Sequence, residues 1–324
     1  MLFILQTAMK LGCIYALVSL ALFISFRILK IADMTTDGCF ILGGAVSVLF
    51  ALAGHPFLGL FLAMIAGSCA GLITAVLQTR MGVPSILAGI ITNTGLYTIN
   101  LMVMGWSSNV SLLKAETVFS IFQKTKVFGS NSDLVLSGIA VILAMVLIRL
   151  FLSTRLGLSL RATGDNPDMV SASSINPGRM VMIGLGISNA LTALSGALAA
   201  QMQRSIDINA GTGIVVIGLA CLIIGETLLC RKRNMSLNIV ACLIGSMIYR
   251  MIYALILKTH VIPIECLKLM TALIVAAAIS FPTVSASISY RNKARKEMKK
   301  CSKLKMSQRS SILELSMKRR HSII

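Results

Sequence analysis

The feature that most constrains this chain is a series of apolar blocks about twenty residues long, separated by short polar segments. A helix needs roughly twenty apolar residues to cross a hydrocarbon core about 30 Å thick. Backbone groups inside lipid must find their hydrogen-bond partners within the protein, which favours helices over open strands. With 56% hydrophobic and 13% charged residues, the sequence predicts an all-α integral membrane protein, folded as a polytopic helical bundle.

The blocks predict about nine spans, and the second of them is unusual. It is short and contains Gly38, Gly43 and Gly44, so a broken, tilted or re-entrant helix is as open there as a clean crossing. The first block is interpreted as a retained span rather than a signal peptide, because it lacks a small-residue cleavage site. The expected spans lie near residues 8–26, 38–53, 57–78, 84–105, 134–152, 180–202, 212–229, 236–257 and 269–288.

Basic residues predict the orientation of the chain. Loop 153–179 carries Arg155, Arg161 and Arg179, which favours a cytoplasmic location for it and, by alternation, for the C-terminus. Tail 291–324 holds twelve of the 30 basic residues, in a chain of net charge +19. We expect a transmembrane domain over 1–290 and a disordered cytoplasmic tail. Contact with anionic lipids, or topology setting alone, fits this tail better than nucleic-acid binding, which would call for interleaved aromatic residues or a folded module.

Residues 161–168 (Arg-Ala-Thr-Gly-Asp-Asn-Pro-Asp) form a polar island inside loop 153–179, and this island predicts a short, well-defined helix. Asn166 suits the N-cap, Pro167 the first helical position, and Asp165 and Asp168 the positive end of the helix dipole. We expect this helix to continue to residue 175, where the segment 176–178 (Asn-Pro-Gly) ends it. From these residues alone, a helix lying on the membrane surface and a helix recognised by another protein are equally open.

Acidic residues near the membrane are few. Asp33 and Asp37 flank the entry to the second block, and Asp207 precedes the glycine-broken start of the seventh, which hints at two related halves. Asp37 suits a cap for a helix beginning at Gly38 slightly better than a binding site in unwound backbone. Glu226 is expected to form an interfacial ion pair with the neighbouring basic residues 231–233.

Polar side chains recur inside the fourth and sixth blocks. An amide at membrane depth is costly unless it faces protein, water or a ligand. For the asparagines, lining a pathway and bonding between helices are both open; Ser188, Thr192 and Ser195 fit helix packing better, as does Gly67-x-x-x-Gly71. The candidate substrate-path residues are Asn93, Thr94, Tyr97, Asn100, Ser188, Asn189, Thr192 and Asp37.

Several functional classes find no support in the sequence. No Gly-x-x-x-x-Gly-Lys-Ser/Thr phosphate loop is present, so the chain is not expected to hydrolyse ATP by itself. The eight cysteines form no Cys-x-x-Cys pair and the three histidines lie far apart, so neither a metal site nor a catalytic site is expected. An ion-coupled secondary transporter would need ionisable residues at mid-membrane. The predicted spans contain almost none, with Arg250 as the main candidate, and this argues against that class.

Taken together, these residues resemble the permease subunits of ABC transporters in the branched-chain amino acid and ribose permease superfamily. The likeness is greatest to a group of uncharacterised ABC-type permeases that includes proposed tryptophan and tyrosine permeases, and it covers most of residues 10–285. The third of the three stretches that carry it is the most specific. They are Tyr15-Ala-Leu through Arg27-Ile-Leu to Asp33-Met-Thr-Thr-Asp37-Gly38; residues 84–101; and Leu160-Arg-Ala-Thr-Gly164-Asp-Asn-Pro167 through Ser188-Asn189 and Ser195-Gly196 to Ile217-Gly-Leu-Ala220 and Ile224-Gly225-Glu226.

The resemblance implies a role for the polar island and a set of partners. The island is similar to the coupling helix that docks on the ATP-binding subunit, and its candidate contact residues are Arg161, Gly164, Asp165, Asn166, Pro167, Asp168 and Met169. The family implies a separate ATPase that holds ATP and Mg²⁺, an extracytoplasmic substrate-binding lipoprotein, and a pair of permeases, expected to be a homodimer. It also implies the bacterial cytoplasmic membrane. An amino acid is the expected substrate, with a sugar or nucleoside as the alternative.

Overall fold

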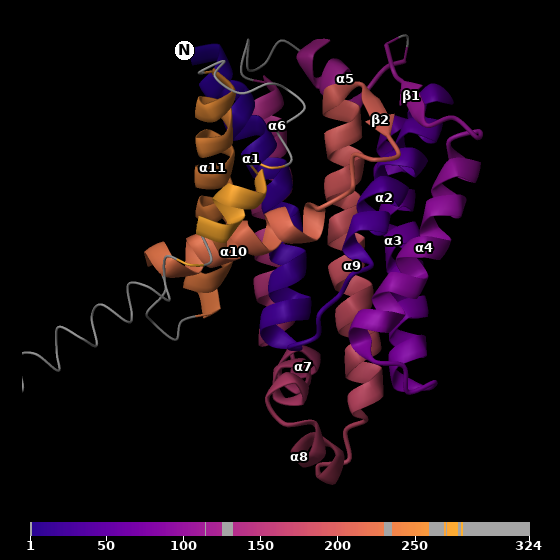
Figure 1. The fold of residues 1–324 in the computed structure, drawn as a ribbon, viewed down its shortest axis with the longest axis vertical. Coiled ribbons are helices and arrows are strands. Elements are labelled where there is room, and N and C mark those ends of the chain that lie inside the picture. Colours follow the sequence, from indigo (N-terminus) through magenta and orange to yellow (C-terminus); the bar gives the residue numbers. More distant parts are fainter. Residues whose placement is uncertain are drawn as a thin grey trace, which may run out of the picture. The chain divides into compact units, whose positions relative to one another are not determined.

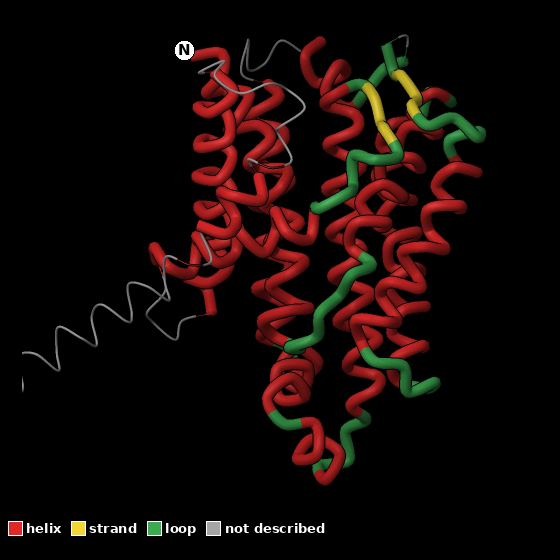
Figure 2. Tube along the Cα trace, in the orientation of Figure 1, coloured by secondary structure: helices red, strands yellow, loops and turns green. Residues whose placement is uncertain are grey.

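The computed structural model describes residues 2–113, 115–124, 132–229 and 235–258, together with 269, 271–277 and 280. Contacts divide the chain into two units, Met1–Val275 and Ala276–Ile324, and helices α1 to α11 and strands β1 and β2 belong to the first unit. The tail 291–324 lies outside the described residues. Figure 2 shows that the described part is almost entirely helical, which confirms the all-α class.

Helices of very different lengths make up this unit (Figure 1). A π-helix, η1, continues α1 directly. The helices are α1 (Leu2–Leu22), η1 (Phe23–Ile28), α2 (Thr36–Leu52), α3 (Pro56–Thr79), α4 (Ser85–Val103), α5 (Val118–Lys124), α6 (Ser132–Ser153), α7 (Arg155–Asp165), α8 (Pro167–Ala172), α9 (Pro177–Gln203), α10 (Ile214–Leu229) and α11 (Met235–Lys258).

In the part of the chain that the structure describes, six helices are long and apolar enough to cross a membrane by length and composition. They are the continuous segment Leu5–Ile28 and helices α3, α4, α6, α9 and α11. Helices α2 and α10 are apolar but shorter, and they correspond to the second and seventh predicted spans. Most of the ninth predicted span lies outside the described residues, although 271–277 are helical. The chain is therefore a multi-pass membrane protein, and the count of nine spans stays a prediction.

Helices α1 and α9 form the centre of the unit. Their residues are mostly buried, whereas most residues of α4 and α6 are not. Glycines allow α9 to approach its neighbours closely: a Cβ at Gly67 of α3 would lie 2.5 Å from the Asn189 carbonyl oxygen, and one at Gly43 of α2 would lie 2.0 Å from that of Ala193. Gly71 meets Leu185 in the same way. The Gly67-x-x-x-Gly71 pattern is thus a packing face, as predicted.

Helix α2 begins inside the bundle rather than at its end. After η1, residues 29–34 run without helical structure and carry the chain from the end near α7 to the middle of the bundle (Figure 2). The segment between β2 and α10 enters the bundle from the opposite end, and α10 starts at its close (Figures 1 and 2). The second predicted span, 38–53, is therefore a continuous 17-residue helix in which Gly38, Gly43 and Gly44 are helical, and the break lies before it, at 29–34.

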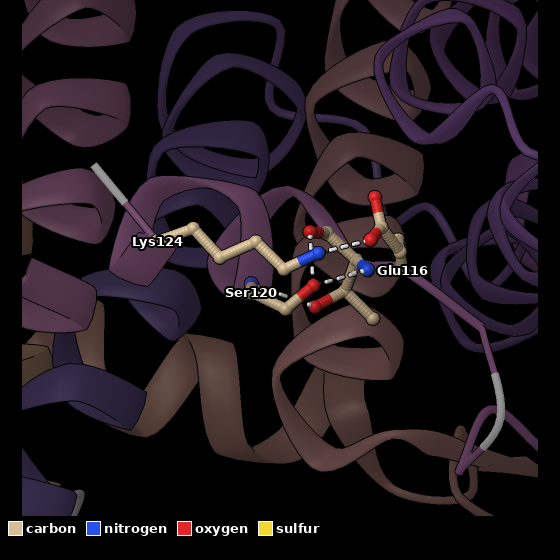
Figure 3. Close-up of polar contacts among 4 residues, drawn as sticks. Glu116, Ser120 and Lys124 are labelled. Atoms are coloured by element: carbon tan, nitrogen blue, oxygen red, sulfur yellow. Dashed lines mark hydrogen bonds and ion pairs between the residues drawn. The ribbon is translucent and has the colours of Figure 1, made fainter.

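The end of the unit opposite α7 and α8 carries a small folded cap (Figure 1). Strands β1 (Asn109–Ser111) and β2 (Ser205–Asp207) pair antiparallel, with Val110 opposite Ile206. Beside them, Thr117 and Ser120 cap α5 reciprocally: the backbone N of each residue donates to the hydroxyl of the other, at 2.8 and 3.1 Å (Figure 3). Lys124 pairs with Glu116 across the same turn.

Candidate functional site

The polar centre of the protein lies at the break between η1 and α2. Asp33 is 2% exposed; its Oδ2 accepts a hydrogen bond from Asn189 Nδ2 of α9 at 2.7 Å, and its Oδ1 accepts one from the backbone N of Thr35 at 2.9 Å. The second bond ties the carboxylate to the start of α2, where the helix dipole is positive. The break is thus held in place by a buried carboxylate and an amide from a distant helix.

Two threonines join this centre to α3. The hydroxyls of Thr35 and Thr74 lie 2.9 Å apart, and Thr74 also bonds to the Ala70 carbonyl oxygen. Thr36 donates to the Asp33 carbonyl oxygen at 3.2 Å. Sequence reasoning did not identify Thr35, Thr36 or Thr74, and their proximity to Asp33 in the sequence was the only available signal for the first two.

Asp37 caps a helix, but not the one expected. It stands in the first turn of α2, and its carboxylate accepts hydrogen bonds from the backbone N of Gly213 at 3.0 Å and of Val215 at 2.9 Å. These groups open α10, so the interpretation of Asp37 as a cap of its own helix was wrong. A carboxylate satisfies the free N–H groups at a helix start whichever chain segment carries it. The starts of the two short helices are therefore fastened together.

The predicted polar face of α4 divides in the structure. Asn100 is fully buried and donates from Nδ2 to the Gly38 carbonyl oxygen at 3.1 Å. Asn93 is half-buried on the same side of α4. Its Oδ1 lies so close to Gly38 that a Cβ at Gly38 would be 2.5 Å from it. Thr94 is exposed and bonds to Ile90 of its own helix, while Tyr97 is 50% exposed. Only the two asparagines reach toward α2 and the central break.

The hydroxyls of α9 bond mainly between helices. Ser188 donates to the Ala21 carbonyl oxygen of α1 and Ser195 to that of Ile14, each at 2.8 Å. Thr192 is buried and bonds within α9 to Ser188. At the far end of the helix, Gln201 is fully buried. Its Nε2 donates to the Ser47 hydroxyl and to the Pro56 carbonyl oxygen, and its Oε1 accepts from the backbone N of Val118. Gln201 was not identified from sequence, although an amide within an apolar block was the available signal.

The polar island forms two helices rather than one. Asn166 caps α8, because its Oδ1 accepts from the backbone N of Asp168 and of Met169, both at 3.1 Å, and Pro167 takes the first helical position. The predicted start of the helix is confirmed. Its predicted end at 175 was wrong: α8 stops at Ala172. Asn176 does not end this helix but caps α9 by accepting from the backbone N of Arg179.

The first of these two helices, α7, rests on the end of η1. A Cβ at Gly164 would lie 1.8 Å from the Ile28 carbonyl oxygen, so only glycine permits this contact. Next to it, Lys30 Nζ lies 2.9 Å from Asp165 Oδ1 in an exposed ion pair. Asp165 is the last residue of α7, rather than a residue at the positive end of α8 as expected. The island is thus attached to the chain segment that leads into the central break. Of its other predicted contact residues, Arg161, Asp168 and Met169 are exposed.

Glu226 and Arg250 have partners that were not predicted from the sequence. Glu226 pairs with Arg27 at 3.0 Å, while residues 231–234 lie outside the described part. Arg250 of α11 places its guanidinium 3.5 Å from the ring centroid of Tyr15 and 5.7 Å from that of Tyr253. A cation–π contact contributes about 0.5–2 kcal/mol, less than the roughly 2.5–3.5 kcal/mol cost of an arginine at the centre of a membrane helix.

Comparison with known proteins places this chain in a transport family. Residues 4–279 match the family model described as branched-chain amino acid transport system / permease component. The chain is 33% identical, over 88% of its length and 94% of the relative's, to a tyrosine transport system permease protein of Clostridioides difficile. No solved structure matches the chain significantly.

Two less similar relatives are named for other substrates. A guanosine ABC transporter permease of Bacillus subtilis is 28% identical over 60% of this chain and 67% of its own. A fructose import permease of Bifidobacterium longum is 22% identical over 82% of this chain and 75% of its own. The resemblance inferred from the sequence motifs is confirmed by these matches.

Proposed function

This chain belongs to the family of branched-chain amino acid transport system permease components, and we propose that it forms the translocation path of an ATP-driven importer for an amino acid. Members of the family are transport subunits, so the chain is not an enzyme. The observation that carries the proposal is the attachment of α7 to Ile28 through Gly164, at the start of the segment that leads to Asp33.

This attachment gives the α7–α8 segment the properties of a lever. Its two helices begin at side-chain caps, Thr154 for α7 and Asn166 for α8. The exposed residues of α8 form a surface for an ATPase subunit, and a displacement of α7 would move Ile28 and the broken segment beyond it. Motion of a partner would in this way reach the Asp33–Asn189 pair as a shift of packed elements. We propose Arg161, Gly164 and residues 165–169 as this coupling segment.

The substrate path is proposed to lie beside the central break. Asn93 is half-buried next to Gly38, and Asn100 and Asn189 each bury an amide oxygen without a hydrogen-bond partner. A ligand or a water molecule would donate hydrogen bonds to these oxygens during transport, because a buried acceptor without a hydrogen bond is costly. The exposed side chains of Thr94 and Tyr97 would complete the path from the partner-facing or lipid-facing side. The remaining proposed residues are Asp37, Ser188 and Thr192.

The wider assembly follows from family membership. Permease components act with an ABC ATPase and a substrate-binding protein, and we propose that ATP and Mg²⁺ bind only to the ATPase. Two copies of this chain would form the membrane part. We further propose nine spans, a bacterial cytoplasmic membrane location, a cytoplasmic α7–α8 end and a cytoplasmic, lipid-contacting C-terminal tail, because positive charge concentrates in loop 153–179 and in 291–324.

An amino acid is favoured as substrate by the similarity to the tyrosine permease, which covers nearly the whole of both chains. The guanosine and fructose permeases are less similar. The decisive experiment is a ligand screen on the cognate binding protein by calorimetry, followed by uptake of the ligand by the complete complex. Binding and uptake of an amino acid support the proposal. A nucleoside or a sugar as the only ligand would contradict it.

A further inference from the structure

Arg250 is the charged group that the proposed path leaves unexplained. It belongs to α11, which is apolar enough to cross the membrane, and lies eight residues, about 12 Å, from the helix end at Lys258. Tyr15, over which its guanidinium lies, is ten residues into the span Leu5–Ile28. The guanidinium therefore lies within the apolar length of both spans, away from their ends.

The contacts of Arg250 leave one edge of its guanidinium free. The Nε atom is buried without a hydrogen-bond partner, and no carboxylate in the described part of the chain lies within ion-pair distance. A ring contact uses the face of a guanidinium and leaves its N–H edge available. That edge matches a carboxylate, which can accept two parallel hydrogen bonds from Nε and a terminal nitrogen.

Three tyrosines lie near Arg250: Tyr15 and Tyr253 by their rings, and Tyr249 as its neighbour in α11. Tyr249 is 1% exposed, and its hydroxyl is also buried without a partner. Tyr249 packs in one buried cluster with Cys221 of α10. Tyr253 lies one helical turn after Arg250 and offers a second ring at 5.7 Å. A guanidinium nitrogen and a hydroxyl, both buried and both without a hydrogen-bond partner, thus belong to consecutive residues of α11.

We infer that Arg250, Tyr249, Tyr15 and Tyr253 form a binding site for a small carboxylate, specifically the α-carboxylate of the transported amino acid, at a point separate from the path beside α2 and α4. Tyr15 and Tyr253 hold the guanidinium, its free edge binds the carboxylate, and the Tyr249 hydroxyl donates a further hydrogen bond. This inference rests on the proposed importer function, which it deepens by naming the group that is recognised. A lipid phosphate is the other source of an anion, but the position of the site, away from the ends of both spans, disfavours a lipid headgroup.

The site can be tested by chemical protection of Arg250 in the full-length chain. The protein, assembled with its ATPase in phosphatidylcholine nanodiscs, is treated with phenylglyoxal, and the modification of each arginine is measured by peptide mass spectrometry. The probes are L-tyrosine and L-tyrosinamide, which differ in the carboxylate. L-Tyrosine should slow modification of Arg250 by roughly tenfold or more, as expected for a charge-assisted contact, and L-tyrosinamide should not. The exposed Arg149 of α6 should react equally in every sample.

Equal reactivity of Arg250 with and without L-tyrosine, or equal slowing by both probes, would overturn the site. Slowing caused by phosphatidylglycerol in the nanodisc, and not by L-tyrosine, would assign the anion to lipid and also overturn it. Uptake supplies a second readout: Arg250→Gln should lower L-tyrosine uptake about tenfold, while Arg149→Gln should keep it. Protection without ATP-driven uptake by the wild type would contradict the importer alone, whereas uptake without protection would contradict the site alone.

Discussion

Gly164 of α7 lies so close to Ile28 of η1 that a Cβ would come within 1.8 Å of the Ile28 carbonyl oxygen. This contact joins the surface helix α7 to the end of η1, directly before the unwound segment 29–34 that leads to the central break. Helix α7 therefore cannot shift relative to η1 without breaking a backbone contact. The proposed transmission of ATPase motion depends on it.

Gly164→Ala should uncouple transport from ATP hydrolysis. The new methyl group has no room, and overpacking of this kind typically costs about 1–3 kcal/mol. We expect normal membrane insertion but reduced substrate-stimulated ATP hydrolysis by the purified complex. Gly138→Ala is the matched control, because nothing lies within 4 Å of a Cβ there. Equal stimulation in the two variants would show that the Gly164 contact carries no signal.

Asn166→Ala should weaken the start of α8. The side chain caps two backbone N–H groups, and the loss of such a cap costs about 1 kcal/mol. A six-residue helix is short enough to fray at this cost, so co-purification with the ATPase should fall while insertion is retained. Asn166→Ser should restore binding, because serine caps nearly as well. If alanine and wild type bind the ATPase alike, α8 is only a surface helix.

Asn189→Leu should destabilise the protein more than Asn93→Leu. Leucine at 189 leaves the buried Asp33 Oδ2 without its amide donor, and an unsatisfied buried group costs about 1–3 kcal/mol, with a charged group at the upper end or beyond. Asn93 is half-buried, so its replacement should reduce transport with little change in stability. Thermal melting and uptake are measured on both variants. Normal uptake by both would remove the asparagines from the substrate path.

Asp37→Ala should loosen the start of α10. The mutation removes acceptors for two backbone N–H groups, and we expect a loss of about 1–3 kcal/mol in the free energy of unfolding. Asp37→Asn keeps one acceptor oxygen and should show about half of that loss. Thermal melting in detergent measures the series. Alanine and asparagine variants that melt together with wild type would show that the two short helices are not fastened by this side chain.

The sequence predicted features that depend on local chemistry and missed those that depend on distant contacts. The Asn166 cap and Pro167 were predictable because a cap and its helix are adjacent in the chain. The role of Asp37 was not, since its partner Gly213 is 176 residues away. The end of α8 was misplaced because Asn-Pro-Gly at 176–178 serves equally well to begin the next helix, and Ser174, with φ 61°, already turns the chain.

The same reason explains the uneven outcome for the candidate site. The pattern of α4 identified a polar side of the helix, and the structure brings Asn93 and Asn100 from it to α2. Periodicity could not place Tyr97, which lies at the margin of that side and is half exposed. Arg250 stood out as an ionisable residue within a span, but only the fold reveals its ring contact with Tyr15.

The most direct test of the account is uptake of L-tyrosine into liposomes by the purified chain, with and without its ATPase, binding protein and ATP. We expect uptake only from the complete, ATP-supplied assembly, and we expect uptake to be lost when Gly164 is replaced by tryptophan in a protein that still inserts. Uptake by the chain alone under a proton or sodium gradient, unaffected by ATP, would contradict the central claim that this protein is the permease of an ATP-driven importer.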